Sequence, residues 1–104
     1  MEFDELVLKP DGLILVDFAS PTCPTCRAAE AHLRRIAEAY SDRVRVFQMG
    51  VTTTEEWKRC EVTSTPTVIC FLREREVCRR AEPFSYEDLN ESVGRVLKEG
   101  EPRG

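Results

Sequence analysis

A pair of cysteines separated by two residues, Cys23 and Cys26, constrains the fold of this chain more than any other feature. The preceding segment, residues 13–19, is apolar except for Asp17, as expected of a strand that is buried on both faces. A helical pattern follows and begins near Pro24, a residue that suits the first position of a helix. Because a C-x-x-C at a strand-to-helix junction is typical of a redox dithiol, the sequence predicts two thiols at the N-terminus of a helix.

Composition and charge limit the classes of protein to which the chain can belong. Its 104 residues suffice for one domain, expected over residues 1–98, with a flexible C-terminal tail over 99–104. Hydrophobic residues make up 41% and charged residues 33%, as in a globular fold, and no apolar stretch is long enough to span a membrane. The net charge of −4 argues against nucleic acid as a partner. The acidic N-terminus does not resemble a signal peptide, so we expect a cytoplasmic location. We also expect a monomer.

Hydrophobic periodicity and capping residues divide the chain into helices and strands. The predicted helices are one around residues 3–7, one over 24–40, one over 57–60 with a capping box of Thr53 and Glu56, and a last one that Ser85 and Asp88 begin. Strands are predicted over residues 13–19, 44–50, 68–72 and 76–80, and the charges of the last mark an edge strand. Strands separated by helices pair in parallel, and the last two strands can form a hairpin. The predicted fold class is α/β, a mixed four-stranded sheet with helices on both faces.

The positions of the two cysteines in the motif predict different roles for their thiols. Cys23 stands at the start of the helix, where unpaired backbone N–H groups and the helix dipole favour the thiolate, the reactive form. Cys26 follows one helical turn later, on the face expected to pack against the sheet. We therefore expect Cys23 to attack a substrate disulfide and Cys26 to resolve the mixed disulfide. Half of a metal site is the alternative for the same motif.

Several motifs in a fixed order make the chain resemble the thioredoxin family. They are the segment 8–12 (LKPDG) leading into 15–18 (LVDF), then the C-x-x-C, then Ile36, Ala37 and Tyr40, and finally Thr65, Pro66 and Thr67. The resemblance covers residues 3–97. It implies a thioredoxin-like three-layer sandwich from which the first strand of the usual fold is missing. The four strands would then lie in the order second, first, third, fourth.

The resemblance also implies a function, a thiol–disulfide oxidoreductase that reduces or exchanges protein disulfides without a cofactor or metal. Asp17 would relay the proton of Cys26. A cis bond before Pro66 would set the Thr65 backbone beside Cys23, where it could pair with an extended substrate. The residues implied in substrate contact are Thr22, Pro24, Thr25, Thr65 and Pro66. The implied partners are disulfide-containing proteins, with a thioredoxin reductase or glutathione as electron donor.

The motif departs from the usual pattern of the family. Thr22 stands where thioredoxins carry a tryptophan, and Pro24 and Thr25 stand in place of a Gly-Pro pair. Gln48 stands where a lysine often faces the buried aspartate, so ionised Asp17 would lack a compensating charge. The proline after the first cysteine leaves open a glutaredoxin-like reductase that uses glutathione. Two non-catalytic alternatives are a dimer that binds zinc or an iron–sulfur cluster between thiolates, and an interaction module.

The other three of the five cysteines are interpreted as structural thiols. Cys70 lies in a strand that is apolar on both faces, where cysteine behaves as a small hydrophobe. Cys78 could oppose Cys70 across the hairpin, but a disulfide needs specific geometry, and we do not predict one. Cys60 is the candidate for an accessory redox thiol. His32 is interpreted as a surface residue and Trp57 as a packing anchor.

Overall fold

The computed structural model describes residues 12–52, 55–73, 75–81 and 84–99. Its elements are, in chain order, β1 (Leu13–Ala19), α2 (Pro24–Ala39), β2 (Val44–Gly50), α3 (Glu56–Arg59), β3 (Thr67–Leu72), β4 (Arg75–Ala81) and α4 (Tyr86–Glu99). The helix predicted around residues 3–7 lies outside the described residues. So does the predicted tail, except for Glu99, the last residue of α4. Within the described ranges, no helix is both long and apolar enough to cross a membrane.

The four strands form one mixed sheet in the order β2-β1-β3-β4, which confirms the predicted order. β1 pairs in parallel with β2 and antiparallel with β3, and β3 pairs antiparallel with β4. The helix α2 provides the long crossover that parallel pairing of β1 with β2 requires, whereas a short turn joins β3 to β4. Every residue of β1 is buried, and β1 pairs with a strand on each side.

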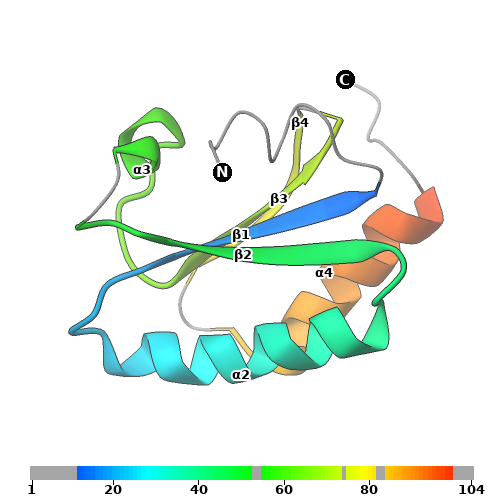
Figure 1. Ribbon diagram of the computed structural model, residues 1–104. Helices are drawn as coiled ribbons and strands as arrows, with labels where there is room; N and C mark the ends of the chain where they lie inside the picture. The colour runs from blue at the N-terminus through cyan, green and yellow to red at the C-terminus, as the bar shows by residue number, and fades with distance from the viewer. Residues whose placement is uncertain (1–11, 53–54, 74, 82–83, 100–104) are drawn as a thin grey trace.

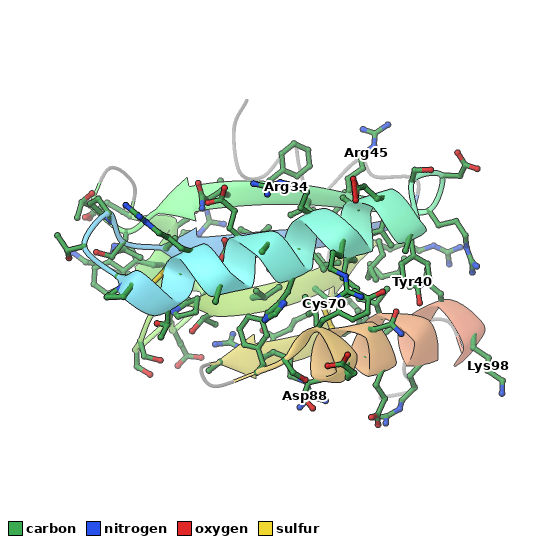
Figure 2. All side chains as sticks on the ribbon, turned by 90° about the horizontal axis from the view of Figure 1, so that it is seen from below. Arg34, Tyr40, Arg45, Cys70, Asp88 and Lys98 are labelled. Atoms are coloured by element: carbon green, nitrogen blue, oxygen red, sulfur yellow. A yellow bond between two sulfur atoms is a disulfide. The ribbon has the colours of Figure 1, made fainter. Side chains whose placement is uncertain are left out.

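Helices cover both faces of the sheet, as predicted (Figure 1). α2 and α4 lie side by side on one face, where Leu33 and Leu89 join Leu13 of β1 in one apolar cluster (Figure 2). α3 lies on the other face, where Trp57 packs against a second cluster that includes Ile69 of β3. Because side chains of a strand alternate between its two faces, the same strands supply both halves of the core.

The apolar spacing of α2 explains how this helix is oriented on the sheet. Its buried residues recur at intervals of three or four and form one face: Cys26, Ala29, Leu33 and Ile36. At its C-cap, the hydroxyl of Tyr40 donates a hydrogen bond to Oδ1 of Asn90 in α4, over 2.7 Å. The guanidinium of Arg35 lies 3.6 Å from the ring centroid of Tyr86, a cation–π contact. The helix that begins at the C-x-x-C is therefore fixed to α4 as well as to the sheet.

The two predicted capping boxes differ in outcome. At the start of α4, the N–H of Asp88 donates to Oγ of Ser85 over 3.1 Å, and the N–H of Ser85 donates to Oδ2 of Asp88 over 3.0 Å. This box is confirmed, and its bonds lower the pKa of Asp88. The box predicted for α3 stays a prediction; the helix begins at Glu56, and its N-cap residue, Glu55, makes no side-chain capping bond. Thr53 lies outside the described residues.

A second disulfide corrects another sequence prediction. Cys70 of β3 and Cys78 of β4 oppose each other in the antiparallel pair and form a disulfide, with Cα atoms 5.0 Å apart. The interpretation of these residues as separate thiols is therefore wrong. The pairing register shifts between Cys70 and Phe71 of β3, directly before Cys78 of β4, so that Phe71 opposes Glu76. Since the position of this bulge decides which residue of β4 faces Cys70, the sequence pattern alone could not place the two sulfurs together.

Candidate active site

The loop between β1 and α2 places Cys23 at the N-cap of the helix, in an extended conformation (φ −98°, ψ 107°). The N–H of Cys23 donates to the carbonyl of Ser20 over 3.2 Å, and Pro24 follows in the first helical turn. Sγ of Cys23 accepts a hydrogen bond from the N–H of Cys26 over 3.2 Å and lies 3.3 Å from Oγ1 of Thr25. The sulfur thus occupies the place of a capping oxygen, at the positive end of the helix dipole.

The two cysteines of the motif form a disulfide, with Cα atoms 5.3 Å apart, and they differ in exposure. Cys26 is 5% exposed and belongs to the buried face of α2, whereas Cys23 is half-buried. Both line an open cavity of about 390 Å³, the disulfide cavity, which extends from the end of β1 to Gln48 and Gly50 of β2. Because exchange requires access to the attacked sulfur, Cys23 is the sulfur that a second molecule reaches more readily.

Asp17 of β1 is buried, with 1% of its surface exposed, which excludes an aspartate that reaches solvent at the end of the strand. Gln48 opposes it in β2, and Nε2 of Gln48 donates a hydrogen bond to Oδ2 of Asp17 over 3.4 Å. The other carboxyl oxygen, Oδ1, is buried and has no hydrogen-bond partner among the described residues. Burial raises the pKa of Asp17 to about 6. The hydrogen bond from Gln48 lowers this pKa, and the negative charge of Glu30 raises it further. The carboxyl therefore changes its protonation state close to neutral pH.

Glu30 and Gln48 connect Asp17 with the disulfide cavity. Both residues line that cavity, and both also line a second cavity of about 290 Å³ that includes Asp17. Glu30 lies one helical turn after Cys26 in α2, and its Oε1 pairs with Arg34 over 3.0 Å. A carboxylate and an amide side chain are thus shared by the cavity of the carboxyl and the cavity of the disulfide. Sequence reasoning did not select Glu30, although its position four residues after Cys26 placed it on the same side of the helix.

The peptide bond between Thr65 and Pro66 is cis, as predicted. Pro66 is buried, and Thr65 lines a third cavity of about 510 Å³, the Thr65 cavity. Trp57 of α3 lines the same cavity, and its Nε1 is buried with no hydrogen-bond partner in the part of the chain described. Ser20 lines both this cavity and the disulfide cavity, so the two adjoin at the loop that holds Cys23.

The structure brings together some of the predicted site residues and leaves others at the rim. Cys23, Cys26, Asp17 and Thr65 line one or another of the three cavities. The lining of these cavities does not include Thr22, Pro24 or Thr25, which are exposed around the start of α2. Thr25 nevertheless contacts the Cys23 sulfur, and the hydroxyl of Thr22 lies 3.3 Å from that of Ser20. Trp57, interpreted from the sequence as a packing anchor only, also belongs to the surroundings of the site.

Cys60 is the one free cysteine among the described residues. It is half-buried and packs against the cluster on the α3 face. Burial raises the pKa of its thiol, against the charges of Arg79 and Arg59. Since a raised pKa lowers the thiolate fraction, this environment does not favour a redox role for Cys60. Across the described ranges, no three or more His, Cys, Asp or Glu side chains are grouped so as to hold a metal ion.

Comparison with known proteins gives consistent matches. The Thioredoxin family model matches residues 1–95. Thioredoxin-1 of Drosophila melanogaster is 32% identical over 89 residues, which cover 85% of this chain and 79% of that protein. Thioredoxin-2 of Saccharomyces cerevisiae is 30% identical over 79 residues, or 75% of each protein. A solved structure described as a malarial protein has the same fold, with a TM-score of 0.76 at 19% identity, over 84% of this chain and 99% of that one.

A disulfide at the N-terminus of α2, with one reachable and one buried sulfur, defines the class of thiol–disulfide oxidoreductases. Within that class, the chain belongs to the thioredoxin family. Proteins of this family act on disulfide-containing protein substrates, and the site described above has the parts that such exchange requires.

Proposed function

We propose that the protein reduces disulfides of other proteins through the thiols of Cys23 and Cys26. The observation that carries this proposal is the contrast between the two sulfurs. Cys23 is half-buried beside an open cavity, whereas Cys26 is 5% exposed. A protein substrate can approach the first sulfur, and the second can react with the first once a mixed disulfide has formed. This division of roles is what a two-step exchange needs.

In the proposed first step, the Cys23 thiolate attacks one sulfur of the substrate disulfide. A new bond forms between Cys23 and that sulfur, the substrate disulfide breaks, and the other substrate sulfur leaves as a thiolate that takes up a proton. In the second step, the Cys26 thiolate attacks Sγ of Cys23, the mixed disulfide breaks, and the second substrate thiolate leaves. Two electrons have then passed to the substrate, and the Cys23–Cys26 disulfide described here is the oxidised product.

The groups around Cys23 support formation of its thiolate. The N–H of Cys26 donates to the sulfur over 3.2 Å, and the hydroxyl of Thr25 lies within 3.3 Å. Hydrogen bonds to the charged form and the nearby positive end of the helix dipole both favour the thiolate over the thiol. Thr25 therefore acts on the nucleophile, in addition to any contact with substrate at the rim.

Asp17 is proposed to accept the proton of Cys26 before the second step. With a pKa of about 6, the Asp17 carboxyl is largely ionised at neutral pH and can act as a base there. Glu30 and Gln48 line both the Asp17 cavity and the disulfide cavity. A proton can therefore pass from Cys26 to Asp17 through the Glu30 carboxylate or through water. Because Gln48 is neutral, no cation at this position holds Asp17 permanently in its charged form.

The Thr65 cavity is the proposed site for the substrate segment that flanks the attacked disulfide. It adjoins the disulfide cavity at Ser20, and Thr65 can offer its backbone to an extended chain. The side chain of Trp57 also lines this cavity and can contact that chain. For return of the disulfide to the dithiol, we propose a thioredoxin reductase, with glutathione as the competing donor. Turnover with each donor system in turn distinguishes the two.

Trapping of the mixed disulfide tests the proposed function. A Cys26→Ser variant should accumulate the mixed disulfide between Cys23 and the substrate, because a serine at position 26 cannot displace the substrate from Cys23. Non-reducing electrophoresis and peptide mass spectrometry of the variant incubated with insulin should show an adduct at Cys23 that dithiothreitol reduces. Cys60→Ser in the same background is the matched control and should trap equally well. An adduct that forms in a Cys23→Ser/Cys26→Ser variant at the same yield would overturn the assignment.

A further inference from the structure

We propose that Cys70 and Cys78 form a second, permanent disulfide that fastens the edge strand β4 to the core and does not exchange with the catalytic pair. The two residues oppose each other in the β3–β4 pair, with Cα atoms 5.0 Å apart, within the range that disulfides require. This site lies outside all three cavities described above. It therefore has a role separate from reduction of substrates.

Burial protects this disulfide from attack. Cys70 has no exposed surface, and Cys78 packs partly buried against the same cluster, which Leu89 and Val93 of α4 cover. Viewed from the helix-covered face, Cys70 lies between α2 and α4 (Figure 2). A thiolate must reach one of the two sulfurs to start exchange, and attack at Cys70 would first require α4 to separate from the sheet. Only the partly buried Cys78 is therefore open to attack, and we expect reduction of the folded protein to be slower here than at the catalytic pair.

The sheet also separates the pair from the other cysteines. Cys70 and Cys78 belong to the cluster on the face covered by α2 and α4, whereas Cys60 packs against the cluster on the opposite face. Cys70 lies three residues into β3 from Thr67, which pairs with Phe18 at the end of β1 that leads to the catalytic loop. At about 3.3 Å per residue, this places roughly 10 Å of strand between the pair and that end. No internal thiol is positioned to open the second disulfide.

The contacts of β4 show what the disulfide adds. Among the described strands, the edge strand β4 pairs only with β3, and a bulge interrupts that pairing directly before Cys78. Arg80 Nε donates to Oγ of Ser92 in α4 over 2.9 Å, and Arg79 Nη2 donates to the carbonyl of Cys60 over 2.7 Å. These polar contacts hold β4 from both faces of the sheet. The disulfide adds a covalent link to β3 directly beside the bulge that interrupts the pairing.

Closure of this disulfide needs an external oxidant. Two thiols lose two electrons and two protons as the bond between their sulfurs forms, and a small-molecule disulfide such as oxidised glutathione takes up both to give two thiols. The exchange proceeds through a mixed disulfide on Cys78 or Cys70, and the second thiolate then displaces the small thiol. Because Cys70 has no exposed surface in the folded protein, its reaction belongs to the chain before α4 has packed onto the sheet.

Differential alkylation of the wild-type protein tests the proposal. The oxidised protein is treated with excess dithiothreitol and iodoacetamide, either in native buffer or in guanidinium chloride, and each cysteine is followed by peptide mass spectrometry. In native buffer, Cys70 should be alkylated about a hundredfold or more slower than Cys23, since its reaction requires local opening. In denaturant, all of them should react at similar rates. Equal rates in native buffer would overturn the proposal, and so would alkylation of Cys70 and Cys78 in unfolded protein without reductant.

Thermal unfolding isolates the stabilising effect of the second disulfide. A Cys23→Ser/Cys26→Ser variant retains Cys70 and Cys78 as its only pair among the described cysteines. Its melting temperature should fall by roughly 10 °C after reduction in denaturant and refolding with reductant. Adding Cys70→Ala/Cys78→Ala to this variant should abolish the dependence on reductant. An oxidised and a reduced form that melt at the same temperature would contradict the stabilising role.

The Cys70→Ala/Cys78→Ala change alone should leave insulin reduction within about twofold of wild type when assayed well below its melting temperature, a result that does not depend on the alkylation test.

Discussion

At the scale of single residues, the buried carboxyl of Asp17 makes stability depend on pH. Its pKa is raised from 3.8 to about 6, chiefly by burial, so the folded state holds a proton in the range where the unfolded state has lost it. Stability from this group is therefore fully present below about pH 4 and is lost as the pH rises through about 6. The loss is roughly 3 kcal/mol, from the size of the shift at 1.36 kcal/mol for each pH unit.

An Asp17→Asn variant should remove this dependence. Because other groups titrate as well, the informative quantity is the difference in unfolding free energy between the variant and wild type, measured with denaturant from pH 4 to pH 7. That difference should grow by about 2–3 kcal/mol in favour of the variant as the pH rises. Glu30→Gln keeps the carboxyl but removes a nearby charge, so it should move the transition to lower pH. A difference that stays constant with pH would show that Asp17 is not buried in its ionised form.

Residue-level features of the site were predictable where a local pattern carries them. Asp17 is the one charged residue in an otherwise apolar strand, and its burial was expected. Gln48 was expected to face Asp17, and the register of β1 with β2 agrees. Trp57 was not connected with the site, because the wall of the Thr65 cavity is assembled from elements that are distant in sequence. Glu30 was not selected although it follows Cys26 by four residues, because its place beside Asp17 depends on the packing of α2 against the sheet.

At the scale of secondary-structure elements, the start of β1 depends on the backbone of Gly12. Its φ is +114°, a conformation that residues with a side chain rarely adopt. A Cβ built on Gly12 would lie 2.7 Å from the carbonyl oxygen of Arg43, which accepts the hydrogen bond of Leu13 that begins the β1–β2 pairing. Gly12→Ala should therefore destabilise the protein by about 1–3 kcal/mol in chemical denaturation.

Gly94 in α4 is the matched control for this substitution. A Cβ there would lie 3.7 Å from the hydroxyl of Tyr40, an ordinary van der Waals distance. Because glycine weakens the interior of a helix, Gly94→Ala should stabilise the protein by about 0.5–1 kcal/mol. Opposite signs for the two glycine-to-alanine changes support the account of Gly12. Equal and small effects would mean that the turn before β1 can relax.

At the scale of the whole molecule, the element order predicted the fold class, whereas the second disulfide was not predicted. The parallel pairing expected of strands separated by helices is confirmed for β1 with β2 but wrong for β1 with β3, which are antiparallel. The strand order, which the resemblance to the thioredoxin family implied, is confirmed. The pairing of Cys70 with Cys78 depends on a bulge that shifts the register of β4, and Phe71 opposes Glu76 as a result. A shift of one residue would turn Cys78 to the other face of the sheet. Register of this kind is decided by packing of the complete sheet.

The most direct test of the central claim is the rate of insulin reduction with dithiothreitol as electron donor. The account assigns the reaction to Cys23, the more accessible sulfur of the Cys23–Cys26 disulfide. Wild-type protein and a Cys60→Ser variant should accelerate precipitation of the insulin B chain equally, while Cys23→Ser should leave only the rate of dithiothreitol alone. A Cys23→Ser variant that retains the wild-type rate, or a folded wild-type protein with no activity, would contradict the claim.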